Sequence, residues 1–250
     1  MIAYPRQWDQ IGRPIVVAEV EKRILEVVSN NCCNCLALSG GLDSSLLLYF
    51  MLEIYATVEV FTIGSSDDHP DIRYAKEIVG NFEKEMNRQP RFPLPLCCLI
   101  KHRIYIPTKE EIRGEPSYGK DVEGDKATRL FYRFVRKYTD TIISGDGADE
   151  FMAGYYDHQN HPNEETYYGH IRQLQKRQLV PLNGNSGNVR VYLPYLDKSL
   201  LYLLCQIPLA EKVNRNERKI LIVKMAKGKI PDSIINRRKI GFCDVLRSDF

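Results

Sequence analysis

The chain has 250 residues, which is long enough to bury the core of one large domain or two small ones. Its hydrophobic fraction of 44% and charged fraction of 27% are ordinary for a globular protein, and a formal net charge of +3 is too small to indicate a nucleic-acid partner by itself. No apolar run is long enough to span a bilayer, and the N-terminal residues lack the apolar core of a signal peptide. We therefore expect a cytoplasmic protein with no membrane partner.

Strand and helix patterns alternate through the first part of the chain. In chain order the sequence predicts a helix with Pro14 in its first turn, a strand at 36–38, a helix at 46–55, a strand at 58–63, a helix at 72–85, a strand at 94–100, a loop with at most a short helix at 109–124, a helix at 126–138 and a strand at 141–144. This alternation implies right-handed crossovers and a doubly wound, mostly parallel α/β sheet.

After residue 150 the pattern becomes helical. Helices are predicted at 164–179, 198–205 and 216–227, and the Asn/Gly-rich segment 183–188 is expected to be a loop tip. We therefore expect residues 1–250 to form a single domain, with an α/β nucleotide-binding part at 1–150 and a helical part at 151–250.

Seven cysteines are present, and five of them gather in two clusters: Cys32, Cys33 and Cys35, and then Cys97 and Cys98. An odd count in a chain without an export signal argues against a disulfide framework. Zinc or iron–sulfur binding is the alternative, but Cys-Cys-x-Cys is not a C-x-x-C spacing and no second C-x-x-C completes it. We favour reduced, buried thiols, and the role of the clusters stays open.

Residues 39–45, Ser-Gly-Gly-Leu-Asp-Ser-Ser, follow the first predicted strand. A strand, a glycine turn and a helix in this order bring backbone N–H groups and a helix N-terminus to one place, which makes an anion site. The carboxylate of Asp43 can hold a metal ion that neutralises bound phosphate. No Lys follows the glycines, so the Walker pattern is excluded. The segment resembles the pyrophosphate-binding loop of the ATP pyrophosphatases, which split ATP between its α and β phosphates.

A second acidic glycine turn, Ser-Gly-Asp-Gly-Ala-Asp-Glu at 144–150, follows the strand predicted at 141–144. Ligands of doubly wound sheets bind outside the carboxyl ends of the strands, so both turns are expected on the same rim. Asp43 and Asp149 can then share one Mg²⁺ with a triphosphate, because Mg²⁺ is usually held by one or two carboxylates plus phosphate oxygens.

The two turns together carry a family resemblance. Segments 39–45 and 144–150, with Gly-Tyr at 154–155, resemble the synthetase domain of the asparagine synthetases. Leu-Pro-Tyr-Leu-Asp at 193–197 is similar to the family's Pro-Phe-Leu-Asp segment, and 231–242 matches its terminal Pro-x-x-Ile…Arg-x-Lys-x-x-Phe signature. The likeness covers nearly the whole chain and implies a fold like that of the adenine nucleotide alpha hydrolases.

The resemblance implies an ATP-dependent ligase that works in two steps. A carboxylate, by default that of aspartate, attacks the α-phosphorus of ATP to give an acyl-adenylate and pyrophosphate; ammonia then displaces AMP to give an amide. ATP and Mg²⁺ are the implied cofactors, with Asp43 and Asp149 as metal ligands and Asp146 near the acyl intermediate. The implied nucleotide contacts are Ala37, Ser39, Gly40, Gly41, Asp43, Ser44, Ile63, Ser144 and Gly145.

Lys239 is the implied catalytic cation. Negative charge grows on the α-phosphoryl group and the leaving pyrophosphate, and a preorganised ammonium stabilises it. The surrounding run is rich in Lys and Arg, which is typical of solvated surface. We therefore interpret Arg237 and Arg238 as a charged face, and Lys219 and Lys224 as helix surface.

The pair His158 and His161 is interpreted as structural. Metal-binding His pairs on helices favour i, i+4 spacing with a nearby Glu, and Pro162 follows this pair directly.

The nitrogen source and the partners follow from one departure from the family. Glutamine-dependent members carry an N-terminal glutaminase whose nucleophile is the Cys exposed after the initiator Met, whereas residue 2 here is Ile2 and few residues precede the first turn. We expect free ammonia, or a separate glutaminase subunit that delivers it. The part between 155 and 193 is short for the family, so the identity of the acceptor carboxylate stays open, as does homo-oligomerisation.

Other functions stay open from the sequence. A tRNA-modifying ATP pyrophosphatase would suit the basic C-terminal run and the cysteines, but the paired C-x-x-C expected for sulfur transfer is missing and the turn at 144–150 points away from it. A synthetase that closes another amide or a lactam ring is a close variant of the first hypothesis. A non-catalytic subunit is disfavoured, because every expected acidic and Lys position is retained.

Overall fold

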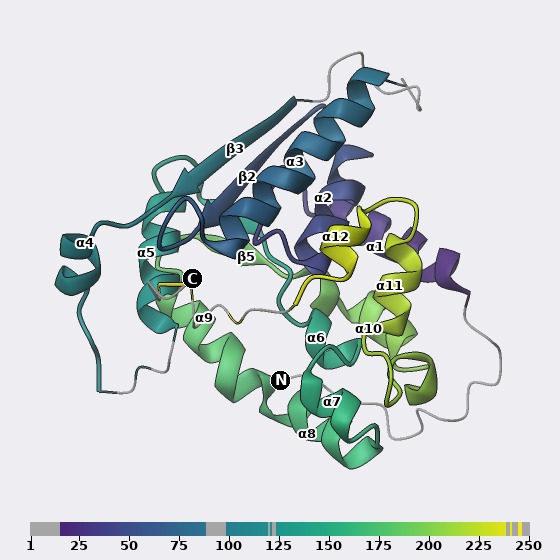
Figure 1. The fold of residues 1–250 in the computed structure, drawn as a ribbon. Helices are drawn as coiled ribbons and strands as arrows, with labels where there is room; N and C mark the ends of the chain where they lie inside the picture. Colours follow the sequence, from purple (N-terminus) through teal and green to yellow (C-terminus); the bar gives the residue numbers. More distant parts are fainter. Residues whose placement is uncertain are drawn as a thin grey trace.

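The structure, a computed structural model, describes residues 16–88, 99–119, 121, 124–238, 241 and 245–246. It contains a five-stranded parallel sheet with strand order β3-β2-β1-β4-β5 (Figure 1). The strands are β1 Cys35–Ala37, β2 Thr57–Ile63, β3 Leu99–Tyr105, β4 Thr141–Ile143 and β5 Arg190–Tyr192. The doubly wound, mostly parallel sheet expected from the sequence is confirmed.

Helices cover both faces of this sheet. Helix α2 (Leu42–Leu52) packs against β1 and β2, and α3 (Pro70–Arg88) packs against β2 and β3. Because β4 lies on the other side of β1, right-handed connections place α5 (Asp125–Val135) on the opposite face. There Phe134 stacks on Tyr105 of β3, with ring centroids 4.8 Å apart.

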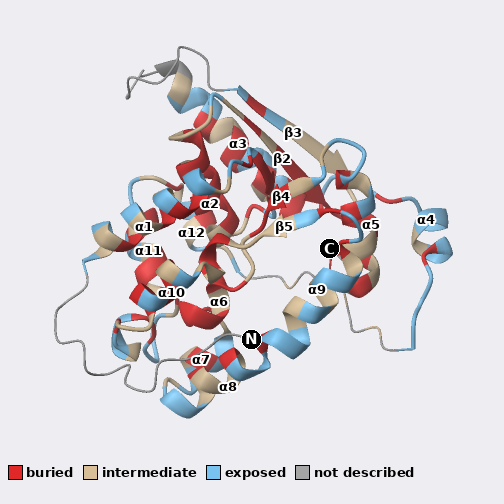
Figure 2. Cartoon of the chain, turned by 180° about the vertical axis from the view of Figure 1, so that it is seen from behind, coloured by how far each residue is buried: buried red, intermediate tan, exposed pale blue. Residues whose placement is uncertain are grey.

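The apolar core surrounds α2 and the central strands (Figure 2). Helix α2 is buried along almost its whole length, and α1 (Val17–Asn30) buries only one face, which packs against α2. The buried residues of α1 are Val20, Ile24, Val27 and Val28. Their i, i+4, i+7, i+8 spacing is that of an amphipathic helix on the outside of a core.

The second half of the chain is helical, as expected. Its elements are α6 Ala148–Phe151, α7 Tyr156–Asn160, α8 Glu164–Leu174, the π-helical turn Gln175–Leu179, α9 Val180–Asn185, the 3₁₀ turns Pro194–Leu196 and Leu209–Glu211, α10 Lys198–Leu204, α11 Ile220–Ala226 and α12 Asp232–Ile235. Helix α4 (Lys109–Gly114) belongs to the first half and lies at the periphery, beside α5 (Figure 1).

Several element boundaries differ from the sequence predictions. The helix predicted at 46–55 begins at Leu42, so Asp43 and Ser44 lie in its first turn. The helix predicted at 216–227 begins only at Ile220. Segment 183–188 is not wholly a loop tip, because α9 extends to Asn185.

Strand β5 was missed, because three residues between an Asn/Gly-rich segment and a proline show no period-2 pattern. Of the strand predicted at 94–100, residues 94–98 lie outside the described residues, and β3 extends beyond the prediction to Tyr105.

Of the two cysteine clusters, the first can be followed in the structure. Cys35 is buried at the start of β1 and Cys33 is buried just before it, with the Cys33 thiol 3.7 Å from Thr141 Oγ1. Cys32 is exposed, so the expectation of buried thiols is wrong for this residue. Cys97 and Cys98 lie outside the described residues, as does Pro14. Within the described ranges, no helix combines the length and apolar character needed to cross a bilayer.

Candidate active site

Both glycine turns line one cavity of about 1010 Å³ at the carboxyl ends of the central strands. Small-molecule sites are typically roughly 300–1,000 Å³, so this cavity lies at the upper end of that range. The predicted site residues that line it are Ala37, Ser39, Gly41, Asp43, Ser44, Ile63, Ser144, Gly145, Asp146 and Asp149. Gly40 is not among the lining residues, and Lys239 lies outside the described residues, so its predicted role stays a prediction.

The first glycine turn, residues 39–45, packs closely against the backbone of α3. Gly40 has φ +64°, and a Cβ at this position would lie 2.4 Å from the backbone N of Ala75. Only glycine accepts both constraints without strain. Gly41 is the N-cap of the 11-residue α2, whose N-terminus therefore lies beside the cavity and favours an anion there. The hydroxyl oxygens of Ser39 and Ser44 lie 3.3 Å apart in the same turn.

Arg237, which is 198 residues from Ser39 in the sequence, binds this glycine turn and α3. Its Nη1 donates to the carbonyl of Ser39 at 2.7 Å, and its Nη2 pairs with the carboxylate of Asp71 in α3. The guanidinium also lies over the ring of Tyr74, 4.6 Å from the centroid. Only 5% of the Arg237 side chain is exposed, so its interpretation as a charged solvated face is wrong.

The second turn carries its own glycine constraint. Gly147 has φ +90°, and a Cβ there would lie 2.2 Å from Cδ2 of Leu196. Ser144 Oγ donates to Asp146 Oδ2 at 2.5 Å, which orients that carboxylate at the cavity wall. Burial and the charge of Asp146 raise the pKa of the neighbouring Tyr132.

The 3₁₀ turn Pro194–Leu196 contacts both glycine turns. Tyr195 is fully buried, and its hydroxyl donates to the backbone carbonyl of Asp43 at 3.0 Å. The adjacent Leu196 packs against Gly147. This segment, singled out in the sequence as 193–197, therefore fixes the two turns relative to each other.

Asp43 and Asp149 converge on the ammonium of Lys219. Lys219 Nζ lies 2.7 Å from Asp149 Oδ1 and also pairs with Asp43 Oδ2. Burial alone would lower the pKa of Lys219, but the charges of Asp149 and Asp43 outweigh it and raise the pKa. The prediction that Lys219 lies on a helix surface is wrong, because its side chain is 9% exposed. Lys224, five residues further along, is exposed as predicted.

Gly154 makes the close approach of these groups sterically feasible. A Cβ at Gly154 would lie 2.0 Å from Asp149 Oδ1 and 2.3 Å from Lys219 Cε. The carbonyl of Gly154 also accepts a hydrogen bond from Arg218 Nη1 at 2.7 Å. The Gly-Tyr pair after the second turn is therefore part of the packing around the carboxylates.

Comparison with known proteins is consistent with this geometry. Residues 28–191 and 183–250 match the family model described as asparagine synthase. The chain belongs to the asparagine synthase family. The resemblance found in the sequence is thereby confirmed.

The relatives of this asparagine synthase family member are distant and longer. The chain is 27% identical over 229 residues to a probable glutamine-hydrolyzing asparagine synthetase of Acanthamoeba polyphaga mimivirus, covering 84% of this chain and 39% of that protein. It is 23% identical over 254 residues to the glutamine-hydrolyzing asparagine synthetase of Gallus gallus, covering 92% of this chain and 42% of that protein. The chain thus spans about two fifths of the length of these relatives.

A solved NMN synthetase from Francisella tularensis shares the fold of this asparagine synthase family member. The TM-score is 0.50 at 14% identity, over 92% of this chain and 78% of that chain. At this identity the likeness concerns the fold alone.

The Asp43–Asp149 pair of this family member fits a magnesium ion. One nitrogen, Lys219 Nζ, contacts an oxygen from each carboxylate, so the two oxygens converge on the position of a single cation. Hard carboxylate oxygens suit Mg²⁺. No group of three or more His, Cys, Asp or Glu side chains suited to a metal occurs within the described ranges. Water and ligand oxygens would complete the ion's coordination shell, because Mg²⁺ usually keeps several waters beside one or two carboxylates.

A polar cluster that the sequence did not indicate lines another part of the cavity. Glu150 Oε1 accepts hydrogen bonds from the Tyr155 hydroxyl and from Gln178 Nε2, each at 2.5 Å. Burial and the neighbouring Glu150 raise the pKa of Tyr155. Gln178 lies in the π-helical turn Gln175–Leu179, which the hydrophobic pattern of the sequence does not predict. Glu150, Tyr155 and Gln178 therefore come together only in the folded chain.

His158 and His161 make separate contacts. His158 is buried, and its Nδ1 accepts a hydrogen bond from the backbone N–H of Tyr155 at 3.3 Å. His161 is exposed and lies 3.1 Å from a carboxylate oxygen of Asp157. Both side chains have protein partners, in keeping with a structural role.

Proposed function

We propose that this chain is an ATP-dependent, amide-forming ligase of the asparagine synthetase type. It activates a carboxylate, by default that of aspartate, as an acyl-adenylate with release of pyrophosphate, and ammonia then gives the amide and AMP. The observation that carries the proposal is the convergence of Asp43 and Asp149, from two different turns, on one cation position beside the N-terminus of α2. Such a site suits the phosphates of a nucleotide.

The first turn is the binding site for the leaving pyrophosphate in this proposal. The N-terminus of α2 and the hydroxyls of Ser39 and Ser44 supply donors for its oxygens. Asp43 and Asp149 would hold Mg²⁺, which neutralises phosphate charge when bound. The nucleoside would lie between the ends of β1 and β2, at Ala37 and Ile63, and the second turn, at Ser144 and Gly145.

Asp146 and Lys239 are the proposed reaction residues. Asp146 lies at the cavity wall, oriented by Ser144, where it can contact the acyl intermediate. Lys239 would stabilise the charge that grows on the α-phosphoryl group. Support comes from Arg237, two residues earlier, which is bonded to the first turn and so holds the preceding chain beside the phosphate site.

The remaining assignments belong to the same proposal. The nitrogen source is free ammonia or a separate glutaminase subunit, the protein acts in the cytoplasm, and residues 1–250 form a single domain. Membership of the asparagine synthase family favours amide formation over adenylation of a tRNA base.

The test is a product analysis. Purified chain is incubated with ATP, MgCl₂, ammonium chloride and a panel of amino-acid carboxylates, and the nucleotides are separated by chromatography. We expect AMP and pyrophosphate in amounts that depend on the correct carboxylate, and no amide when glutamine replaces ammonium. ADP with orthophosphate as the products would overturn the proposal.

A further inference from the structure

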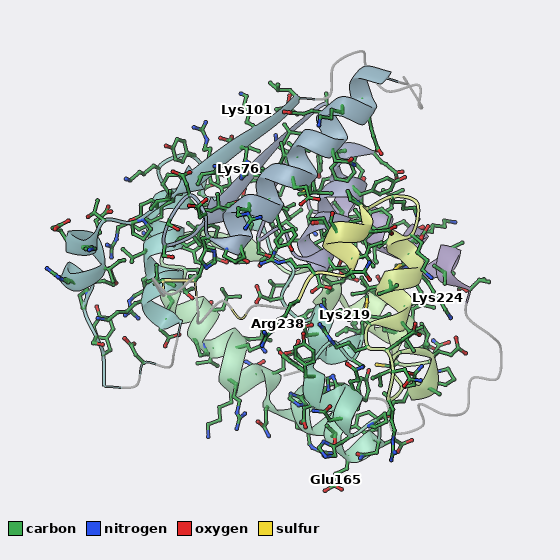
Figure 3. All side chains as sticks on the ribbon, in the orientation of Figure 1. Lys76, Lys101, Glu165, Lys219, Lys224 and Arg238 are labelled. Carbon is green, nitrogen blue, oxygen red and sulfur yellow. The ribbon has the colours of Figure 1, made fainter. Side chains whose placement is uncertain are left out.

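The ammonium of Lys219 lies between the carboxylates of Asp43 and Asp149. Lys219 lies between α11 and α6 (Figure 3). Its ammonium pairs with one carboxylate from each glycine turn. The pair is the one to which the proposed function assigns Mg²⁺. A lysine and a divalent ion therefore compete for the same two carboxylates.

We propose that Lys219 is the built-in counter-ion of the Asp43–Asp149 pair and makes divalent-metal binding depend on bound nucleotide. The inference rests on the proposed function only in assigning Mg²⁺ to these carboxylates. In the nucleotide-free chain the ammonium compensates one of the two carboxylate charges, so a divalent ion alone gains less by entering than it would at two carboxylates without the lysine.

Burial makes this competition strong. The side chains of Lys219, Asp43 and Asp149 are 9%, 19% and 19% exposed, so water screens their charges poorly. With the lysine the three groups carry a formal charge of −1, and without it two adjacent carboxylates carry −2. Removal of one partner from a buried ion pair leaves the other charge uncompensated. A divalent cation is the natural replacement for the missing ammonium.

The position of Lys219 is set by its backbone. Lys219 has φ +56°, a left-handed conformation that non-glycine residues adopt at a cost, and it directly precedes α11. Its backbone N–H donates to the carbonyl of Ala153 at 3.3 Å, and its side chain passes Gly154 at a distance that no Cβ would permit. Strained backbone of this kind persists where the surroundings hold it, and here it aims the ammonium at the carboxylates.

A bound nucleotide changes the balance of charge. Its phosphates bring further negative charge into the cavity, enough for the ammonium and a divalent ion to be accommodated together. The proposal therefore separates two states: without nucleotide Lys219 is the cation that pairs with both carboxylates, and with nucleotide a metal ion joins it.

The test uses Mn²⁺ as the probe on nucleotide-free protein, followed by electron paramagnetic resonance. Lys219→Met should bind Mn²⁺ at least ~10-fold more tightly than the original chain, a change of about 1.4 kcal/mol. Mg²⁺ should raise the melting temperature of Lys219→Met and leave that of the original chain unchanged. Lys101→Met is the matched control, because Lys101 is an exposed residue on β3, far from Lys219 (Figure 3), and it should behave like the original chain.

Equal Mn²⁺ affinity in the original chain and in Lys219→Met overturns the proposal. If Lys219→Met unfolds without metal, it and Lys219→Gln should refold on addition of Mg²⁺, and failure of both to do so also overturns it. Gain of Mn²⁺ binding should disappear in Lys219→Met/Asp149→Asn. These assays contain no ATP and no acceptor, so they can fail while AMP formation succeeds, or succeed while AMP formation fails.

Discussion

The two glycine turns of the site follow the same plan but are supported differently. Each begins at the end of a parallel strand, contains a glycine with positive φ, and presents an aspartate to the same cation. Gly40 in the first turn is backed by backbone atoms of α3, whereas Gly147 in the second turn is backed by the side chain of Leu196. The first turn therefore has a rigid support, and the second has one that can repack.

The two supports also come from different distances along the chain. Arg237 binds the first glycine turn from 198 residues away in the sequence. The 3₁₀ turn Pro194–Leu196 packs against the second glycine turn through Leu196 and donates a hydrogen bond to the first through Tyr195. The sheet therefore supplies the positions of the two aspartates, while the helical half holds them at a common point. Four changes test that division.

The largest effect is expected on AMP formation, when one of the two aspartates that share the cation position is replaced. Asp43→Asn and Asp149→Asn should each reduce AMP formation by roughly 1,000-fold, because each removes one carboxylate from the proposed metal site. The double variant should lose little more than either single variant, since both act through one cation. The measurement is turnover at saturating Mg²⁺, with circular dichroism as the check on folding. Near-normal turnover of either single variant would contradict the shared site.

The second largest effect is expected on stability, when the contacts of Arg237 with the first glycine turn are removed. Arg237→Ala leaves the carboxylate of Asp71 buried without its partner, and should reduce the free energy of unfolding by about 3 kcal/mol. Arg237→Lys should lie between, because one ammonium cannot replace the two-armed guanidinium contact.

The matched control for this change is Arg238→Ala, an exposed neighbour that should alter the free energy of unfolding by less than about 0.5 kcal/mol. Urea denaturation measures both. Equal, small losses in the two variants would mean that Arg237 does not fasten the first turn.

Lys239 follows Arg237 by two residues and is the proposed catalytic cation. If the segment fastened by Arg237 delivers the catalytic cation, Lys239→Ala should slow adenylation by at least ~100-fold, the scale for one preorganised electrostatic contact. Arg238→Ala should slow it much less. Pyrophosphate release in a single turnover gives the rate, and a comparable loss in both variants would assign the whole run to charged surface.

The smallest effect separates the two glycine supports directly. Both Gly40→Ala and Gly147→Ala force a positive φ on alanine, which costs about 1–2 kcal/mol by itself. Leu196→Ala should relieve the added clash of Gly147→Ala, giving a favourable coupling of about 1 kcal/mol in a double-mutant cycle. The same Leu196→Ala should add independently to Gly40→Ala, because the neighbours of Gly40 are backbone atoms of α3. Coupling of equal size in both cycles would show that the supports do not differ.

Local pattern by itself determined the α/β half and the two turns. A short apolar run followed by glycines and then a helix specifies strand, turn and helix without reference to distant residues, and strand ends in a parallel sheet meet at one rim. That is why Ser39, Asp43, Ser144 and Asp149 were placed together from the sequence and line one cavity in the structure.

Tertiary structure alone decided which distant side chains complete the site. Lys219 and Arg237 stand in a basic run, and a charged residue in such a run looks the same in sequence whether it meets water or a buried carboxylate. Their partners lie 176 and 198 residues away, in Asp43 and Ser39. Glu150, Tyr155 and Gln178 likewise meet only because the π-helical turn brings Gln178 back to the second turn. Hydrophobic periodicity indicates which face of a helix or strand is buried, but not which charged side chain lies opposite that face. The pairing of distant charged side chains is set when the helical half folds onto the rim of the sheet.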